Sequence, residues 1–442
     1  MSNRVKRNIG ISVIVILCCV CLCKFPLATI SAIVSPCVTI LGNAITADSL
    51  CYITFILINI ILCALYIYVR ICEKKSLHTV RLADAVCVFN VVYIISYAIR
   101  DIYGTSGWWS FLVFSAFYIV YFVAGQQYYN TLIHILLLVF SVEFIIAIVF
   151  YVFNINQFIT PGFGQRTSGT YHNPNTLYPL CLLAFPIALQ LANMKTSVWA
   201  RYVYYTIAAL SLIALILTFQ RAGWIALAVA GVYLAFTVRG WFHSKRVLSS
   251  VIVIAILLSA GALFLRTNGK MIGNKYDRST LGRIAIWNVA FHIFVSRPIF
   301  GYGQGTYQLM QRKSMGESLD KFNPMNDEPK SLILLIAIEF GVIGVVSAIF
   351  IVFSYCTARR RLTADKNMRC NIHIVNGIDA ALMAVLIAGF VDTPILYSLR
   401  LPSTIFALVL IAIIAKMDAC QSRTIACADF NRKPCTTGEF CE

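Results

Sequence analysis

The sequence predicts an all-α polytopic membrane protein with about twelve transmembrane helices and one large extracytoplasmic loop that contains short helices. The 442 residues are 60% hydrophobic and only 12% charged, with a mean hydropathy of +0.80, whereas a soluble domain carries about 25% charged residues. Long apolar runs recur along the chain, and each can cross a hydrocarbon core of about 30 Å as a helix. The runs lack the alternation of a β-barrel, so helices that satisfy their own backbone are expected.

The domain organisation follows from where these runs fall. We expect helices 1–9 with small outer loops in 1–265, the large loop in 266–330, helices 10–12 in 331–416 and a cytoplasmic tail in 417–442. The expected spans are 8–27, 51–69, 82–99, 108–126, 132–153, 176–193, 202–219, 222–238, 249–265, 331–356, 374–396 and 403–416. The weakly apolar stretch 28–50 could be re-entrant. A basic start followed by an apolar run resembles a signal peptide, but no small-x-small cleavage site follows, so a retained first helix is expected.

The distribution of Lys and Arg predicts the orientation of the chain in the membrane. The net charge of +18 would suit nucleic acid, but most Lys and Arg sit in short loops between apolar runs, where topology explains them. Of the 36, 21 lie in segments assigned to the inside, five in short outer segments and ten in 266–330. We therefore expect a multi-pass protein of the bacterial inner membrane, with both termini cytoplasmic, an extracytoplasmic active face and no nucleic-acid partner.

The 16 cysteines suggest neither a disulfide framework nor a metal site. Those in apolar runs, such as Cys63, Cys87 and Cys181, are expected to be small packing residues, and the large loop has none. The C-terminal residues Cys420, Cys427, Cys435 and Cys441 match no compact zinc spacing.

Two arginines in short outer loops oppose the topology bias and need a reason. Arg221 lies in the tight joint Gln220-Arg221-Ala222-Gly223-Trp224, and Arg166 lies in a loop rich in Gly, Ser, Thr and Asn. Arginine binds phosphate well because its fork is planar, permanently charged and bidentate. The alternative for Arg221 is contact with lipid headgroups. Asn175 or Thr176 could cap the helix that follows the Arg166 loop, and the amides of this loop would also suit a sugar.

The large loop has two notable parts. Its start predicts a helix capped by Ser279 or Thr280, with Arg283 in the first turn and one face formed by Ile284, Trp287 and Phe291. A Gly-rich turn at 298–305 lacks the strand and helix of a nucleotide site. At the end of the loop, Asp327, Glu328 and Lys330 could transfer protons, or they could simply begin a helix.

Four acids fall inside predicted spans, where charge is costly and usually faces a cavity or a partner. They are Glu143, Glu339, Asp379 and Asp392. An ion pair of one of these acids with Arg221 or Arg283 is a hypothesis.

The pattern resembles the O-antigen ligase and O-antigen polymerase superfamily over roughly residues 160–345. The similar features, in order, are Arg166…Gly169…Asn173-Pro174-Asn175, Gln220-Arg221-Ala222-Gly223-Trp224, Arg283…Trp287…Pro298…Gly301-Tyr302-Gly303-Gln304-Gly305 and Leu332…Glu339-Phe340-Gly341…Gly344.

The resemblance implies a helical bundle with one large outer loop and a specific reaction. Members transfer a glycan from a polyprenyl-pyrophosphate carrier to an acceptor glycan or glycolipid at the outer face, without nucleotide sugar, metal or other cofactor. By position, Arg221 and Arg283 would hold the pyrophosphate, with Arg166 a third candidate. Asn173, Asn175, Trp287, Tyr302, Glu339 and Asp392 are candidates for glycan binding or for structure.

One departure bears on the activity. Ligases typically have a His-Asn pair, assigned to activating the acceptor hydroxyl, where this chain has Lys330 and Ser331. This favours a polysaccharide polymerase over a ligase, with Glu328 or Asp327 as the candidate base and Lys330 as a candidate phosphate contact. Direct displacement would invert the anomeric carbon. The other partners expected are the bilayer and a chain-length regulator, and the competing classes are a transporter or glycan flippase and a membrane scaffold.

Overall fold

The computed structural model describes twelve stretches of the chain, and every structural statement below concerns them. They are 47–72, 81–99, 109–123, 129–155, 158–160, 164–171, 173–194, 197–237, 278–315, 329–364, 372–395 and 401–432. Their elements are α3 (Ala47–Cys72), α4 (Leu82–Ile99), α5 (Trp109–Val123), α6 (Tyr129–Val152), β1 (Phe158–Thr160), β2 (Gly164–Arg166), η2 (Gly169–Tyr171), α7 (Pro174–Met194), α8 (Val198–Leu217), α9 (Arg221–Thr237), α11 (Arg278–Ser296), α12 (Tyr307–Met315), α13 (Leu332–Ala364), α14 (Ile372–Gly389) and α15 (Leu401–Arg432).

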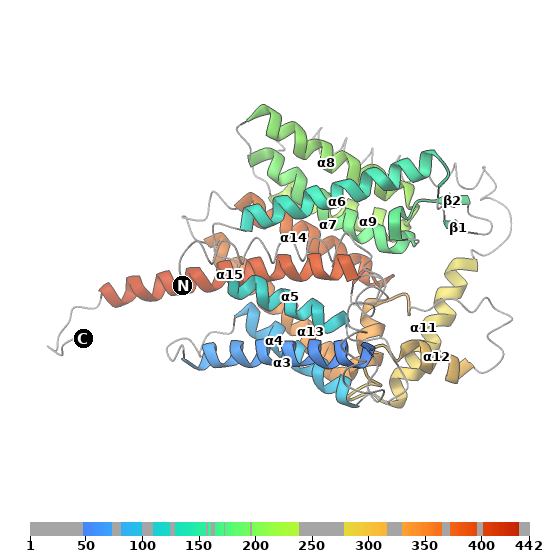
Figure 1. The fold of residues 1–442 in the computed structure, drawn as a ribbon, viewed down its shortest axis with the longest axis horizontal. Helices are drawn as coiled ribbons and strands as arrows, with labels where there is room; N and C mark the ends of the chain where they lie inside the picture. The colour runs from blue at the N-terminus through green and yellow to red at the C-terminus, as the bar shows by residue number, and fades with distance from the viewer. Residues whose placement is uncertain are drawn as a thin grey trace.

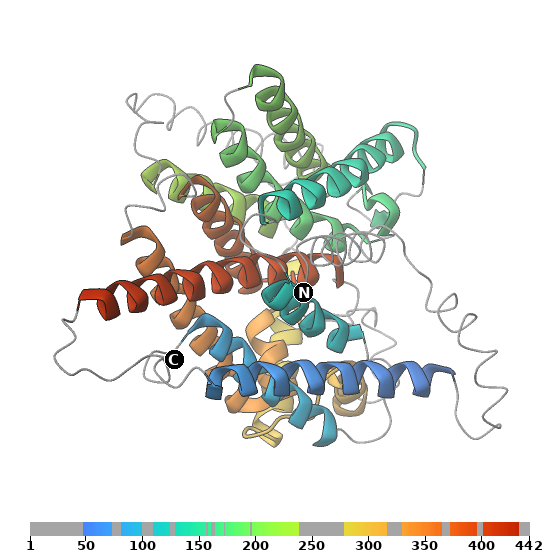
Figure 2. The ribbon, with the colours of Figure 1, turned by 60° about the vertical axis from the view of Figure 1, so that its left-hand side comes forward.

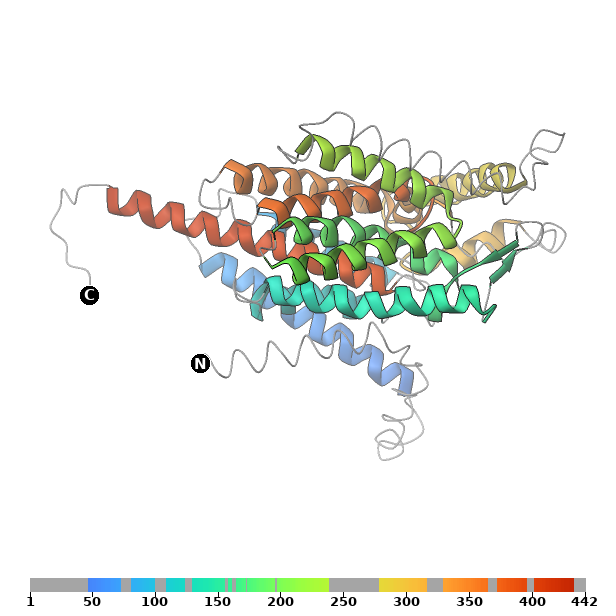
Figure 3. The same cartoon turned by 90° about the horizontal axis from the view of Figure 1, so that it is seen from above.

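The long helices form a bundle with its axis horizontal in Figure 1. Helix α7 packs against α8 and α14, α15 packs against α5, and α13 packs against α4. Seen from above, α6, α7 and α8 run side by side with α14 and α15 beneath them (Figure 3). Helices α11 and α12 and the strands β1 and β2 lie together beyond one end of the bundle (Figure 1). We call this end the loop end and the other the opposite end.

Ten of the expected spans coincide with helices, namely α3 to α9 and α13 to α15. Six helices are long and apolar enough to cross a membrane: α6, α7, α8, α13, α14 and the part Pro402–Cys420 of α15. Further apolar helices, among them Leu82–Ser96 and Arg221–Thr237, are shorter. The chain is therefore a helical multi-pass membrane protein. The expected spans 8–27 and 249–265, and most of the stretch 28–50, lie outside the described residues.

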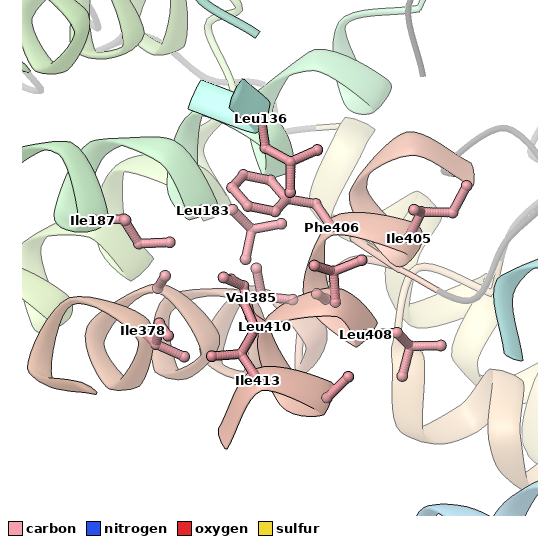
Figure 4. Packing of buried hydrophobic residues seen from close by; sticks show 14 of the residues in the cluster. Leu136, Leu183, Ile187, Ile378, Val385, Ile405, Phe406, Leu408, Leu410 and Ile413 are labelled. Carbon is pink, nitrogen blue, oxygen red and sulfur yellow. The ribbon is translucent and has the colours of Figure 1, made fainter. Parts of the chain in front are cut away.

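The core lies where α6, α7, α14 and α15 meet. Figure 4 shows Leu136, Leu183, Val385, Phe406 and Leu410 pointing toward one another there. The outward faces of the same bundle remain apolar, as with Val142 of α6 and Phe353 of α13. Apolar side chains on both faces are what a helix needs between a protein core and lipid. Cys63, Cys87 and Cys181 are buried among apolar neighbours, which confirms their expected packing role.

Ion pairs join the helices at the opposite end. Arg359 pairs with Asp379, whose carboxylate also accepts hydrogen bonds from Tyr355 Oη at 2.5 Å and Tyr233 Oη at 3.0 Å. Arg361 lies 3.3 Å from Asp418. Arg70 Nε lies 2.8 Å from Asp84, and α3 appears as the long blue helix in Figure 2. Asp379, one of the acids inside a predicted span, thus has its ion-pair and hydrogen-bond partners on α9 and α13.

The fold contains a hairpin that the sequence pattern did not predict. Strands β1 and β2 pair antiparallel, with Phe158 opposite Arg166 and Thr160 opposite Gly164. The segment is too short to show alternation in the sequence. As the last residue of β2, Arg166 lies beside the turn between the end of α8 and the start of α9.

Candidate functional site

Arg166 is buried against the turn that joins α8 to α9. Its Nε donates to the carbonyl of Thr218 at 2.7 Å, and its Nη2 donates to Oε1 of Gln220 at 3.0 Å. The next residue, Thr167, donates its N–H to the carbonyl of Leu217 at 3.0 Å. The guanidinium therefore fixes the turn that carries Arg221, and it does so from another loop.

Gln220 links this arginine to a buried acid. Its Nε2 donates to Oδ2 of Asp392 at 2.6 Å, and Oδ1 of the same carboxylate accepts the N–H of Thr393 at 2.9 Å. Asp392 is fully buried. It lies in the turn after α14, which ends at Gly389, so the expected continuation of this helix to residue 396 is wrong. Both oxygens of this buried carboxylate therefore have a hydrogen-bond donor, as buried polar groups need.

Arg283 reaches the same turn from α11. Its Nη1 donates to the carbonyl of Val391 at 2.9 Å, one residue from Asp392. One helical turn later, Trp287 donates its indole N–H to the carbonyl of Lys330 at 3.2 Å. Side chains four residues apart share a helix face. This face of α11 therefore docks on the α14–α15 connection and on the start of α13.

Arg221 is the first residue of α9 and follows Gln220 directly. The preceding Phe219 has a left-handed backbone, with φ of +51°, which is uncommon for a bulky residue. This sharp turn is closed by Gly223, where a Cβ would lie 2.9 Å from Leu215 and 3.0 Å from Tyr178. The turn thus sets Arg221 beside the Arg166–Gln220–Asp392 network, partly exposed.

Glu143 binds the loop that follows Arg166 through two hydrogen bonds. Its carboxylate accepts the N–H of Thr170 at 2.7 Å and the hydroxyl of Thr170 at 2.9 Å. Gly169 has φ of +57°, and a Cβ on it would stand 2.2 Å from Glu143 Oε1. Only glycine fits there without a shift. The buried acid therefore has a structural explanation: it anchors η2 on α6.

Helix α13 is broken where the large loop meets it. Gly341 has φ of +66° and ψ of −164°, so the carbonyls and N–H groups around it lose their partners within the helix. The turn after α11 replaces them: Tyr302 and Gly303 donate to the carbonyls of Ile338 and Glu339, both at 2.9 Å. In return, Val342 and Ile343 donate to the carbonyls of Pro298 and Ile299, at 2.7 and 3.5 Å.

Glu339 strengthens this junction with its side chain. Its Oε1 accepts the N–H of Gly305 at 2.8 Å, and its carbonyl accepts the hydroxyl of Ser96 at 3.2 Å. Tyr302 lies under the guanidinium of Arg297, 4.8 Å from ring centre to Cζ. These contacts make Glu339 and Tyr302 parts of the scaffold that seats the Gly-rich turn.

Two local expectations are corrected. The cap of α7 is Asn173, whose Oδ1 accepts the N–H of Asn175 at 2.9 Å, and Asn175 is already inside the helix. The cap falls there because Pro174 suits the first helical position. On α11, Ile284 and Phe291 are exposed while Trp287 faces Lys330. The buried face instead consists of Ile286, Ala290 and Ile293.

The arginine site therefore brings together Arg166, Arg221, Arg283, Gln220 and Asp392. Sequence reasoning did not single out Gln220, although it directly precedes Arg221 in a tight joint, where a polar side chain must find a partner. Lys330 lies at the edge of this group with a left-handed backbone, φ +51°. Asp327 and Glu328 lie outside the described residues.

Comparison with known proteins gives two matches. A family model described as O-Antigen ligase matches residues 206–349, which include Arg221, Arg283 and Glu339. A Rickettsia conorii protein named "Putative polysaccharide ligase" is 26% identical over 178 residues, covering 38% of this chain and 41% of that protein. The chain thus matches about two fifths of the length of this relative. Both findings confirm the resemblance to the O-antigen ligase superfamily.

Proposed function

We propose that this chain, a relative of the O-antigen ligases, is a membrane glycosyltransferase that joins a glycan from a polyprenyl-pyrophosphate carrier to a sugar acceptor. The observation that supports this most directly is the convergence of Arg166, Arg221 and Arg283 at the loop end, next to apolar spans. A carrier of this kind has an apolar tail and a pyrophosphate at the membrane surface. A cluster of guanidinium groups at that level suits such a ligand.

The three arginines have different proposed roles. Arg283 bonds to a neutral carbonyl through Nη1, and within the described part of the chain its other N–H groups have no partner, so a phosphate can take them. Arg221, partly exposed at the start of α9, is the second pyrophosphate contact. Arg166 is buried against Thr218 and Gln220, so we assign it to positioning Arg221.

The proposed reaction is a direct displacement. The acceptor hydroxyl oxygen bonds to the anomeric carbon, the bond from that carbon to the pyrophosphate oxygen breaks, and polyprenyl pyrophosphate leaves. The hydroxyl proton passes to a base, for which Asp327 and Glu328 are the candidates, while Lys330 contacts a phosphate oxygen. Arginines in a poorly solvated site stabilise the charge that develops on the leaving group. The product is inverted, and a trapped glycosyl-enzyme would contradict this route.

Within this reaction we favour a polymerase over a ligase. The reason is Lys330-Ser331 at the position where ligases typically have His-Asn. A polymerase takes a second carrier-linked glycan as acceptor, and we propose a chain-length regulator as a further partner. We also propose the finer topology expected from the charge distribution: about twelve spans in the inner membrane, both termini cytoplasmic and the loop end extracytoplasmic.

A transporter or flippase would share one feature, the interrupted helix α13, because transporters bind ligands at broken helices. Here, however, the N–H groups of Val342 and Ile343 and the carbonyls of Ile338 and Glu339 are bonded to the turn after α11. They are not available to an ion or a substrate. The interruption therefore supports the glycosyltransferase reading better than transport.

Binding of the carrier tests the arginine roles. The protein in lipid nanodiscs is titrated with undecaprenyl pyrophosphate, with undecaprenyl monophosphate as the comparison. Loss of a charge-assisted bidentate contact is worth about 1.5–3 kcal/mol, so Arg221→Ala and Arg283→Ala should each weaken binding by about 10- to 100-fold. Lysine at either position should restore little of it.

The matched control is Arg360→Ala, which removes an exposed arginine at the opposite end and should leave binding unchanged. Equal binding by wild type, Arg221→Ala and Arg283→Ala would end the pyrophosphate assignment. A uniform loss that includes Arg360→Ala would mean that net charge, not the site, attracts the lipid.

Acceptor dependence separates polymerase from ligase. Purified protein is supplied with carrier-linked glycan extracted from the host membrane and with no other acceptor. A polymerase should produce a ladder of longer carrier-linked chains on a gel. A ligase should produce none until a separate glycolipid acceptor is added, and that result would reverse our preference.

A further inference from the structure

The end of α11 and the turn after it form an apolar surface that the described core does not cover. Phe291, Val295, Ile299 and Phe300 are 55%, 54%, 60% and 51% exposed. Phe291 and Val295 share a helix face, and the turn 298–300 extends it. The polar residues His292 and Ser296 are also exposed and lie beside this stripe on the helix. The exposed side of this segment therefore presents apolar side chains next to a few polar ones.

The junction with α13 fixes the level of this surface along the bundle. The carbonyl of Ile299 accepts the N–H of Ile343, and that of Pro298 accepts the N–H of Val342. The tip of the turn therefore lies beside the tenth to twelfth residues of a helix that begins at Leu332 and is apolar enough to span a membrane. It cannot rise away from the bilayer while these bonds hold.

The length of α13 then gives the depth of this surface in the membrane. We take the basic residues Arg359 to Arg361 as the point where the helix leaves the hydrocarbon at the opposite end. From Ile343 to Arg359 is about 24 Å at about 1.5 Å per residue, which is less than the hydrocarbon thickness of about 30 Å. Ile343, and with it Ile299, therefore falls inside the apolar layer near its boundary.

We infer that the surface from Phe291 to Phe300 is inserted into the acyl chains of the lipid leaflet on the loop-end side. Its occupant is lipid because the surface continues the outward apolar face of α13, where Val342 and Val346 are 47% and 58% exposed. Interfacial helices insert in this way, by roughly 5–10 Å. The stacked Arg297 and Tyr302 fit the headgroup level, where such side chains gather.

This makes the end of α11 and the turn that follows it, residues 291–300, a re-entrant element. The inference does not depend on the enzymatic function. It states that Arg283 and the inserted apolar surface lie along one helix, since Arg283 and Phe291 are about two turns apart.

Spin-label accessibility tests the inference on the full chain in nanodiscs. A nitroxide is attached to genetically encoded p-acetylphenylalanine, which leaves the native cysteines untouched, at Phe291, Ile299 or Phe300. References are Val346, on the outward face of α13, and Ser314, exposed on α12. Power saturation compares collisions with oxygen, which concentrates in lipid, and with a water-soluble nickel chelate.

The three test positions should match Val346, with an oxygen-to-nickel ratio several-fold above that of Ser314. A ratio equal to that of Ser314 would place the surface in water and overturn the inference. Shielding from both reagents would also overturn it, because a second copy or another protein would then cover the surface.

A measurement on the unmodified protein covers the case in which a labelled variant misfolds. A phospholipid with a diazirine in its acyl chain is photolysed in the same nanodiscs, and labelled peptides are mapped by mass spectrometry. The peptide containing residues 291–300 should be labelled as strongly as that containing Val346. Absence of label there, with normal labelling of α13, would contradict the inference.

Discussion

Arginines at the two ends of the bundle have different kinds of partners. At the opposite end, Arg70, Arg359 and Arg361 each pair with a carboxylate. At the loop end, Arg166 and Arg283 donate to main-chain carbonyls and to the amide oxygen of Gln220. A neutral acceptor orients a guanidinium without cancelling its charge. One end thus uses arginine to tie helices together through carboxylates, while at the other end Arg283 is oriented by the neutral carbonyl of Val391, which leaves its charge for an anion.

The ends also differ in backbone. At the opposite end the pairing residues sit on regular helices, such as α13 and α14. At the loop end the structure depends on a left-handed Phe219, a broken α13 and glycines at Gly169 and Gly341. Irregular backbone at membrane depth is tolerated where protein satisfies its polar groups. The proposed site thus lies where the helices end, and the ion pairs lie where the helices are continuous.

The largest effect on stability should come from breaking the ion pair of Asp379. Asp379→Ala leaves Arg359 without its carboxylate, and loss of one partner of a buried pair costs about 3–5 kcal/mol. Asp84→Ala is the matched comparison: its carboxylate is 24% exposed against 4% for Asp379, while Arg70 is 10% exposed against 31% for Arg359. If burial of the carboxylate sets the loss, Asp84→Ala should destabilise the protein less. Thermal unfolding in detergent measures both variants, and equal shifts would show that burial of the carboxylate does not set the loss.

A smaller but still large effect is expected at the broken helix. Gly341→Ala places a Cβ 2.1 Å from the carbonyl of Ile299 at a φ of +66°, so the turn must separate from α13. Strained backbone of this kind costs about 1–3 kcal/mol. Hydrogen exchange at the amides of Tyr302 and Gly303 should rise. Gly231→Ala on α9, where a Cβ would meet nothing within 4 Å, should leave exchange unchanged.

The smallest change tests the link between Arg166 and Asp392. Gln220→Leu removes both hydrogen bonds, each worth about 1 kcal/mol, so it should lower the free energy of unfolding by about 2 kcal/mol and carrier binding about tenfold. Gln220→Glu keeps an acceptor for Arg166 but faces Asp392 with a second carboxylate. Because two close carboxylates favour sharing a proton, this variant should be more stable at pH 5 than at pH 8. Wild-type binding by Gln220→Leu would remove the positioning role.

Much of the bundle could be predicted because each span is a local apolar pattern. The helix that carries Arg283 could be predicted for the same reason, but its expected cap at Ser279 or Thr280 is wrong: α11 begins at Arg278, so both residues lie inside it and Arg283 falls in its second turn. Which residues form the buried face of α11 could not be predicted, because Trp287 donates to the carbonyl of Lys330, 43 residues away in sequence. The acid Asp392 was recognised as costly, but its partner Gln220 lies 172 residues away. No local pattern reports such contacts.

The roles of Asp327 and Glu328 remain predictions, since both lie outside the described residues. The role of the Gly-rich turn at 298–305 could not be predicted from the turn alone, because it depends on contact with α13. Gly301 leaves room for the carbonyls of Ile338 and Glu339, where a Cβ would stand at 2.6 and 2.7 Å. The glycines serve contact between two backbones, not phosphate binding.

This junction has a consequence for how the protein assembles. In an unbroken α13, Val342 and Ile343 would donate to Ile338 and Glu339, four residues earlier. Docking of the turn exchanges these two hydrogen bonds for four. Helix α13 can therefore enter the membrane as a continuous helix, with every backbone group satisfied, and open at Gly341 only when the finished turn arrives. The exchange would make seating of the loop a late, reversible step of folding that needs no exposed polar intermediate in the bilayer.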